Sequence, residues 1–176
     1  MPKKNIKVLL LLGSVVLLCV LISICVSLQL FLGIGTVQTI GNMMKPSFPN
    51  GSYLVTVPIS SLNRGDVVVF KDPKGRDIKY IARIIGLPDE SVKLESGKVF
   101  INNVELDETS YLNRIEKVFG GPAGASWEEG QAKTLQKNQY FVLGDNSINA
   151  IDSRFLGPVS KNAIVSKVAF CYWACK

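Results

Sequence analysis

The 176-residue sequence contains no histidine. This absence excludes a Ser-His-Asp triad, a Cys-His pair and any histidine-ligated metal site within the chain. Charged residues are also missing from position 8 to position 44, and no internal repeat is present. At this length we expect one membrane segment and at most one domain of ordinary size.

Basic charge gathers at the N-terminus. Of the twenty basic residues, Lys3, Lys4 and Lys7 precede the uncharged run, and no acidic residue does. The remaining seventeen exceed the fourteen acidic residues by only three. Because no dense basic patch or DNA-binding motif accompanies this balance, we expect no nucleic-acid partner. The sequence also predicts no metal and no cofactor.

Residues 8–34 form an almost wholly apolar run of about 27 residues, whereas about 20 suffice to cross a bilayer as a helix. The flanking lysines predict a cytoplasmic N-terminus. Residues 33–35 resemble a signal-peptide cleavage site, but a signal h-region is only about 7–15 residues long. We therefore predict a cytoplasmic segment at 1–7, an uncleaved anchor at 8–34 and an extracytoplasmic domain at 36–176, in a single-pass protein of the cell membrane.

The predicted domain contains short β-branched or aromatic runs separated by turn residues. This pattern is typical of an antiparallel β-sandwich or barrel, so we predict a mainly β domain. Residues 162–176 are ambiguous between helix and strand. The predicted strands are residues 53–57, 66–70, 78–85, 92–94, 98–101 and 139–143.

Two further features leave alternatives open. Residues 113–138 resemble a loop between hairpins, in which Trp127 either packs locally, the favoured interpretation, or contacts a partner. Cys171 and Cys175 form a C-x3-C pair. A disulfide is one possibility, but we favour packing near the membrane or no role, since this spacing alone is not a zinc motif.

Four segments in order resemble type I signal peptidases, the membrane-anchored Ser/Lys endopeptidases that remove signal peptides. Residues 64–70 (RGDVVVF) and 80–88 (YIARIIGLP) are similar to two strands of that family, and residues 99–106 (VFINNVEL) to the following hairpin. Residues 144–154 (GDNSINAIDSR) resemble its G-D-N-x-x-x-S-x-D-S-R motif. The resemblance covers nearly all of the chain and implies the signal peptidase fold.

The position of the family's nucleophilic serine is occupied by methionine. The family carries that serine in an S-M-x-P-[ST] motif just after the anchor. Met44, Pro46 and Ser47 match the last conserved positions of the motif, which places Met43 at the nucleophile position. A thioether has no proton to lose and does not attack a carbonyl.

The position of the family's general base is also substituted. The base is a lysine directly before the arginine of the second motif, so Arg83 marks the arginine and Ala82 the base. Ala150 replaces a serine that often hydrogen-bonds the lysine. In addition, residues 89–90 (DE) replace a Gly-Asp pair. These changes fit together, because without the serine no buried lysine is needed.

Nearby residues do not predict a relocated dyad. Lys79 lies three positions before Ala82, an odd offset that turns it to the opposite face of a strand. Ser47 lies four residues from the nucleophile position. Ser147 already belongs to the turn of the motif at residues 144–154, which we call the third motif. Lys45 and Ser47 share a face only if their stretch is extended.

The family's conserved polar residues support the site rather than perform chemistry. Asp152 and Arg154 at two-residue spacing predict an ion pair on one side of a strand. The Gly-Asp-Asn stretch is equally compatible with an ordinary turn. The positions that we assign to structural support are Gly144, Asp145, Asn146, Asp152 and Arg154.

The sequence therefore predicts a catalytically inactive, signal-peptidase-like membrane protein that binds an extended peptide or partner protein outside the membrane. The resemblance extends to accessory proteins of sortase-dependent pilus assembly in Gram-positive bacteria, which implies a pilin, signal peptide or sortase as partner. The alternatives are an active signal peptidase with an unconventional dyad and a structural membrane subunit. The predicted cleft residues are Met43, Met44, Lys45, Pro46, Ile81, Ala82 and Arg83.

Overall fold

The computed structural model describes residues 3–110, 112 and 117–175. Residues 1–2 of the predicted cytoplasmic segment and residues 113–116 of the predicted loop lie outside this part. The chain folds as two compact units, Met1–Gly35 and Thr36–Lys176.

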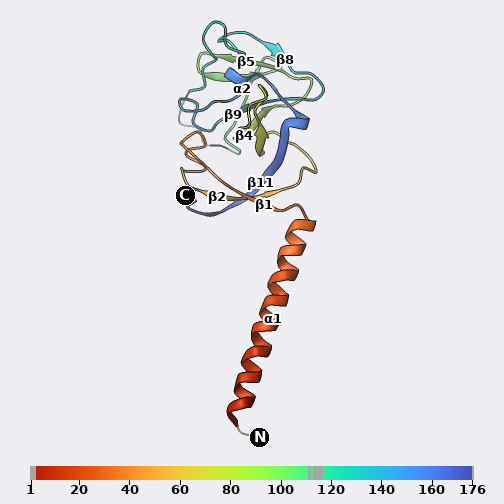
Figure 1. Cartoon of the computed structure of the whole chain (residues 1–176). Helices are drawn as coiled ribbons and strands as arrows, with labels where there is room; N and C mark the ends of the chain where they lie inside the picture. The colour runs from red at the N-terminus through yellow and green to blue at the C-terminus, as the bar shows by residue number, and fades with distance from the viewer. Residues whose placement is uncertain (1–2, 111, 113–116, 176) are drawn as a thin grey trace. The chain divides into compact units, whose positions relative to one another are not determined.

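The first unit contains the uninterrupted helix α1 (Lys3–Phe31) (Figure 1). Its stretch Leu10–Phe31 has a mean hydropathy of 2.8 and is long and apolar enough to cross a membrane. A helix suits this composition, since it satisfies every backbone polar group within the segment itself.

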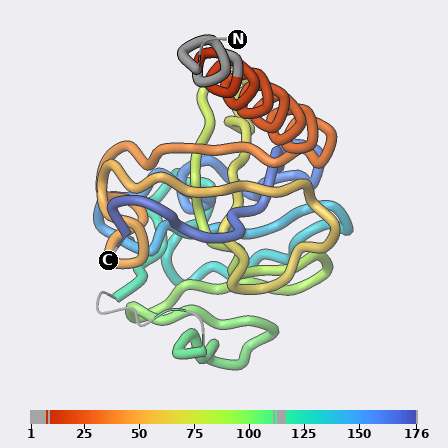
Figure 2. The backbone as a smooth tube through the Cα atoms, turned by 90° about the horizontal axis from the view of Figure 1, so that it is seen from below, coloured from red at the N-terminus to blue at the C-terminus, as the bar shows by residue number. Residues whose placement is uncertain are grey.

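The second unit contains a seven-stranded and a four-stranded sheet, together with the short helices α2 (Ser153–Leu156) and η1 (Lys161–Ala163). The seven-stranded sheet has the order β1-β2-β11-β3-β4-β9-β10. Figures 1 and 2 show β1, β2 and β11 side by side at one end of this unit. Its strands are β1 (Gly35–Gln38), β2 (Tyr53–Val57), β3 (Val67–Lys71), β4 (Lys79–Gly86), β9 (Gln139–Leu143), β10 (Val159–Ser160) and β11 (Ile164–Trp173).

The four-stranded sheet lies at the other end of the unit (Figure 1) and has the order β7-β6-β5-β8. Its hairpins turn at residues 96–97 and 102–103, and all four residues have positive φ. Tight turns of this kind favour Gly and Asn, which explains two of the turn signals in the sequence. Its strands are β5 (Ser91–Glu95), β6 (Lys98–Ile101), β7 (Val104–Glu105) and β8 (Lys133–Thr134).

Strands β3 and β4 are buried on both faces, which explains their nearly continuous apolar sequences. One face contributes to a core that we call the central cluster. The other face contributes Val67, Val69 and Ile81 to a second core, the cleft-side cluster, together with Met44, Leu54 and Val168. The central cluster contains Val68, Phe70, Tyr80, Ala82, Ile84, Tyr140, Val142, Leu156, Val159 and Ile164.

A third core joins β4 and β9 to the small sheet, and Trp127 lies within it. The Trp127 side chain is only 2% exposed, its ring lies 4.6 Å from that of Phe141, and its Nε1 donates to the Val92 carbonyl at 3.1 Å. Trp127 is therefore a packing residue, which confirms the favoured interpretation of this residue.

The mainly β antiparallel fold is confirmed. All six predicted strands are present as β2, β3, β4, β5, β6 and β9, with bounds shifted by at most one residue. The ambiguous C-terminal stretch is strand β11 followed by a turn.

The favoured interpretation of the last two cysteines is wrong, because Cys171 and Cys175 form a disulfide with a Cα–Cα distance of 5.9 Å. Cys171 pairs with Leu54 of β2, the pairing ends at Trp173, and the chain turns back through Ala174, which has a positive φ. The turn at Ala174 brings Cys175 within disulfide distance of Cys171. The bond therefore forms at the end of a strand and does not depend on a helix.

Candidate functional site

Residues 41–48 form a compact turn that precedes β2. The Lys45 amide donates to the Asn42 carbonyl at 3.2 Å, and the Phe48 amide to the Met44 carbonyl at 2.8 Å. The Met44 side chain is fully buried in the cleft-side cluster. Burial of Met44 fixes the turn against the sheet, and its neighbour Met43 is thereby held at the boundary between two cores.

The predicted nucleophile and base positions, Met43 and Ala82, adjoin one apolar cluster. Ala82 is 1% exposed and belongs to the central cluster, and the partly buried Met43 packs against the same cluster. A lysine at position 82 would enter this apolar environment, which is what lowers the pKa of a lysine toward neutrality. With Met43 and Ala82 present, these two positions offer neither a nucleophile nor a proton acceptor.

The third substituted position, Ala150, adjoins the same place. A Cβ added to Gly144 would lie 2.4 Å from the Ala150 Cβ and 2.8 Å from the Met43 carbonyl oxygen. The Asn146 amide donates to that Met43 carbonyl at 3.0 Å. The turn of the third motif therefore packs directly on the nucleophile position, and only glycine fits at residue 144.

Arg83 and Asp145 form a buried ion pair behind this turn. The Arg83 Nε and Nη2 atoms donate to the two Asp145 carboxylate oxygens at 2.8 and 2.6 Å. Arg83 also donates to the Gly65 carbonyl at 2.8 Å and to the Ser47 hydroxyl at 3.2 Å. This bidentate pair, together with the bond to Ser47, joins β4 to the turn that contains Asp145 and to the turn at residues 41–48.

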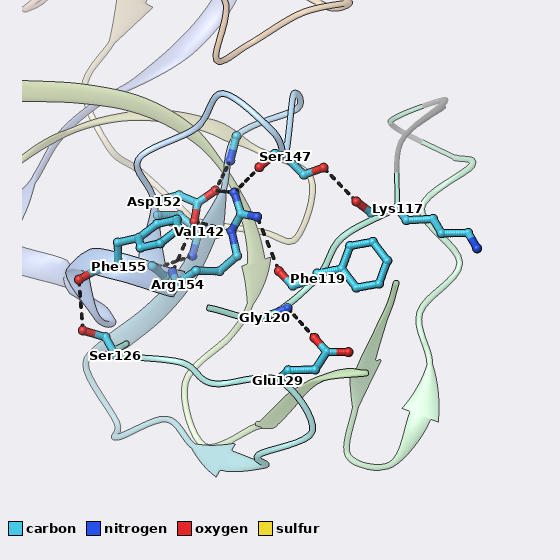
Figure 3. A network of polar contacts seen from close by, with 12 residues as sticks. Lys117, Phe119, Gly120, Ser126, Glu129, Val142, Ser147, Asp152, Arg154 and Phe155 are labelled. Atoms are coloured by element: carbon cyan, nitrogen blue, oxygen red, sulfur yellow. Dashed lines mark hydrogen bonds and ion pairs between the residues drawn. The ribbon is translucent and has the colours of Figure 1, made fainter. Parts of the chain in front are cut away.

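Asp152 and Arg154 form a second buried pair, shown in Figure 3. The Arg154 Nε and Nη2 atoms lie 2.8 and 2.9 Å from the Asp152 carboxylate, which also accepts the Gly144 amide at 3.0 Å. The ion pair is present, but the strand that we predicted to carry it is wrong. Asp152 is the N-cap of helix α2, a position where an aspartate satisfies open amides.

Arg154 also connects the third motif to residues 117–130. Its Nη2 atom donates to the Ser147 carbonyl at 2.7 Å and its Nη1 atom to the Phe119 carbonyl at 3.4 Å. The Ser147 hydroxyl in turn donates to the Lys117 carbonyl at 2.9 Å (Figure 3). These contacts hold the described part of the long loop onto the turn that carries the site.

An apolar cleft of about 310 Å³ lies between the stretch after α1 and the start of β4. Of the seven predicted cleft residues, Met43, Met44 and Ile81 line it, whereas Ala82 faces the central cluster and Arg83 pairs with Asp145. Lys45 and Pro46 are outside the lining. The lining residues are Val37, Gln38, Thr39, Ile40, Gly41, Met43, Met44, Val69, Ile78, Lys79, Tyr80 and Ile81.

The cleft wall at residues 37–41 was missed in the sequence. These residues lie just after the anchor, at the start of the predicted domain (36–176), and the sequence analysis assigns no strand or cleft residue to them. The signal that identifies them is the β-branched sequence Thr36-Val37, followed by Thr39-Ile40, which favours an extended strand.

The residues that could replace the dyad, Lys79 with Ser47 or Ser147, show no serine–lysine hydrogen bond within the described part of the chain. Lys79 lines the cleft beside Ile81, on the face of β4 opposite to Ala82, as its odd offset predicts. The Ser47 hydroxyl accepts from Arg83, and the Ser147 hydroxyl donates to a backbone carbonyl. Neither serine lines the cleft, and neither has Lys79 among the hydrogen-bond partners that the described residues provide.

Comparison with known proteins identifies the family. Residues 10–173 match the family model "Signal peptidase, peptidase S26", and the chain belongs to this family. It is 33% identical over 143 residues to signal peptidase I of Bacillus caldolyticus, covering 77% of this chain and 78% of that protein. It is 30% identical over 145 residues to signal peptidase IB of Staphylococcus aureus strain COL, covering 76% and 74%.

A solved structure of a signal peptidase I from Enterococcus faecalis V583 is also similar. The likeness covers 61% of this chain and 97% of that one, with 25% sequence identity and a TM-score of 0.48. Together with α1, membership of the family indicates a membrane-anchored protein.

Proposed function

We propose that this chain is a catalytically inactive, signal-peptidase-like membrane protein that binds an extended peptide or partner chain outside the membrane. The observation that carries the proposal is the identity of the side chains at the two positions expected to hold the nucleophile and the base. Met43 and Ala82 occupy the nucleophile and base positions, and both pack on one apolar cluster. The surrounding frame, including the Arg83–Asp145 and Asp152–Arg154 pairs, remains in place.

An open backbone edge beside the cleft supports peptide binding. Strand β4 pairs with β3 from Lys79 to Arg83, but its pairing with β9 begins only at Arg83. On the β3 side, the Ile84 amide donates to the Asp66 carbonyl, and the Ile84 carbonyl accepts from the Gly65 amide. Because antiparallel bonding alternates, the Ile81 amide and carbonyl point to the opposite edge, which no described strand covers.

The opposite wall of the cleft offers an apolar side-chain contact to a bound strand. Ile40 lies in this wall with a side chain that is 86% exposed. Strand addition takes its affinity from main-chain hydrogen bonds and its specificity from pockets for alternate side chains. Neither contribution requires a serine or a lysine, so peptide binding is compatible with the loss of catalysis.

The specific role that we propose is an accessory factor or chaperone in sortase-dependent pilus assembly, with a pilin, a signal peptide or a sortase as partner. It rests on the resemblance to signal-peptidase-like proteins without the dyad. We further propose that the N-terminus is cytoplasmic, since Lys3, Lys4 and Lys7 flank the apolar helix.

The test uses the full chain in nanodiscs and a synthetic peptide from the C-terminal half of a signal sequence. We expect binding without cleavage. N-methylation of the peptide amides that face β4 should abolish binding, whereas N-methylation of the alternate amides, which do not pair with β4, should not.

Three outcomes contradict the proposal in different ways. Cleavage that disappears in Ser47→Ala or Lys79→Ala would identify an active peptidase with an unconventional dyad. Equal binding of both methylated peptides would exclude strand addition. Crosslinking of the natural partner at α1 rather than at the cleft would indicate a structural subunit.

A further inference from the structure

Two lysines face each other across strands β3 and β4, and one of them, Lys79, lines the cleft. In the β3–β4 register, Lys71 lies directly opposite Lys79, and Val69 lies directly opposite Ile81. Opposed residues share a face, and so do residues two apart on one strand. The two lysines therefore extend the same face that forms the apolar floor of the cleft at Val69 and Ile81.

This lysine pair is not neutralised by the described residues. Both side chains are exposed, and neither forms an ion pair within the described ranges. Like charges directly opposite each other on a sheet are unfavourable. An anionic group placed between or beside them would relieve this repulsion.

The other charges of the β3–β4 connection leave the pair positive. Asp72 is bound by Arg76, so these two charges cancel. Lys74 and Asp77 are both exposed and also cancel in net charge. Among the residues that line the cleft, Lys79 is the one that carries a charge, so a ligand meets a positive potential beside this residue.

The cleft is larger than a methyl group requires. Its volume of about 310 Å³ lies at the lower limit of ordinary ligand pockets, which are roughly 300–1,000 Å³. A methyl side chain would leave most of this space unfilled, and unfilled apolar space lacks the contacts that stabilise a complex. A leucine, methionine or phenylalanine side chain fills more of it.

We propose that the cleft selects an extended peptide that carries an acidic side chain two residues from a bulky apolar side chain. The proposal rests on the peptide binding proposed above. A strand added to the open edge of β4 places alternate side chains about 6.6–6.8 Å apart on one face, which matches the step from Ile81 to Lys79. The apolar side chain then lies on Val69 and Ile81, and the carboxylate lies beside Lys79.

The test compares matched peptides on the full chain in nanodiscs of zwitterionic lipid. The peptides contain Leu-x-Glu, Leu-x-Gln or Ala-x-Glu, each also in the reversed order, because both strand directions are possible. We expect Leu-x-Glu or its reverse to bind about three- to tenfold more tightly than its Gln counterpart at low ionic strength. The preference should largely vanish at about 0.5 M salt, where exposed charges are screened.

Charge reversal on the protein provides the second arm. Lys79→Glu should eliminate or invert the preference for Glu over Gln, and Lys71→Glu, one strand farther from the peptide, should reduce it less. Lys161→Glu is the matched control, because Lys161 is exposed, lies in η1 and lines no part of the cleft.

Each outcome decides between the two proposals. Equal binding of Glu and Gln peptides, or of Leu and Ala peptides, overturns this inference and leaves peptide binding intact. An equal effect of Lys161→Glu also overturns it, since the attraction is then a property of net charge. Failure of every peptide to bind contradicts the proposed function itself.

Discussion

At the scale of single residues, Ala82 lies in the central cluster, against which Met43 also packs. The sequence predicts which positions the missing serine and lysine would occupy, because neighbouring motif residues fix the count. Sequence alone does not show that both positions adjoin one apolar cluster, since Met43 and Ala82 are 39 positions apart in the chain. Their meeting depends on how the turn after the anchor packs on β4.

Ala82→Lys should destabilise the protein by about 3 kcal/mol or more at pH 7, because the new ammonium group is buried in the central cluster. Burial lowers the pKa of the lysine below its unfolded value of about 10.4. The unfolded state then binds more protons, so the deficit should shrink as the pH rises toward about 10. Chemical denaturation of wild type and variant in detergent, from pH 6 to 10, measures this trend.

Ala82→Met is the matched control for this substitution. It adds a side chain of comparable length without a charge, so its cost should come from overpacking alone and should not depend on pH. A pH-independent cost for Ala82→Lys would contradict the burial of this position.

Asp72 predicts a second pH effect, at acidic pH. Burial of its carboxyl opposes ionisation, but hydrogen bonds from the Lys74 amide and the Arg76 guanidinium, with their charges, outweigh it and lower the pKa of Asp72. Stability from ionised Asp72 is therefore complete above the unfolded pKa of about 3.9 and is lost as the pH falls through the lower folded pKa. The difference in stability between wild type and Asp72→Asn should follow that course.

A carboxyl-detected NMR titration measures the Asp72 pKa directly. A midpoint at or above about 3.9 would contradict the prediction. Asp89→Asn is a suitable comparison, because Asp89 lies in an exposed turn with no ion pair to a described residue.

At the scale of elements, the turn of the third motif organises the site more than any strand does. It packs Gly144 on Met43, pairs Asp145 with Arg83 and caps α2 with Asp152. Through Arg154 it also holds the loop that contains Phe119. The turn therefore connects the site to a part of the chain that has little regular structure.

Arg154→Ala should cost about 3 kcal/mol or more, because it leaves the Asp152 carboxylate buried without its ion-pair partner. The two side chains are 6% and 1% exposed. Lys98→Ala is the control, since its pair with Glu105 is 54% and 53% exposed and should cost at most about 1 kcal/mol. Equal losses of unfolding free energy in the two variants would contradict a structural role for the buried pair.

Sequence patterns missed several strands for two physical reasons, short length and irregular register. Strands β7, β8 and β10 contain two residues each, too few for alternation to be recognised. Strand β11 is long, but its register with β2 and β3 shifts at three places. Each such irregularity breaks the two-residue period, which explains why residues 162–176 were ambiguous.

The misassigned strand at Asp152 and Arg154 illustrates the limit of spacing arguments. Two-residue spacing places side chains on one face of a strand, but a helix cap brings residues N-cap and N2 together as well. The opposite charges of Asp152 and Arg154 made the ion pair predictable. The helical conformation of the backbone that carries them was not predictable from the spacing. Residues 37–41 were likewise not recognised as a cleft wall, because their sequence lies just after the apolar anchor.

At the scale of the whole molecule, the chain combines a membrane-length helix with a domain that contains a disulfide. Disulfides persist in oxidising compartments and are rare in the cytosol. The disulfide therefore supports the predicted external location of residues 36–176, independently of the lysines before the helix.

A membrane-impermeant thiol reagent tests this orientation in intact cells. We expect Cys171 and Cys175 to react only after treatment with a reductant. Labelling before reduction would contradict the disulfide, and labelling only after cell lysis would contradict the external location.

Reduction of the purified protein should lower the unfolding free energy by about 2 kcal/mol, the chain-entropy value for so short a loop. The double variant Cys171→Ser/Cys175→Ser should show the same loss and no further change with reductant. This variant therefore separates the disulfide from any effect of the reductant on the rest of the protein.

The burial of Trp127 has a practical consequence for all of these measurements. The chain contains two tryptophans, and the other, Trp173, is 68% exposed beside the disulfide. Their indole emissions therefore report on opposite environments, one on the core between the two sheets and one on the solvent-facing end of β11. In Trp173→Phe the remaining fluorescence follows the core alone, and in Trp127→Phe it follows the C-terminal turn, without any added label.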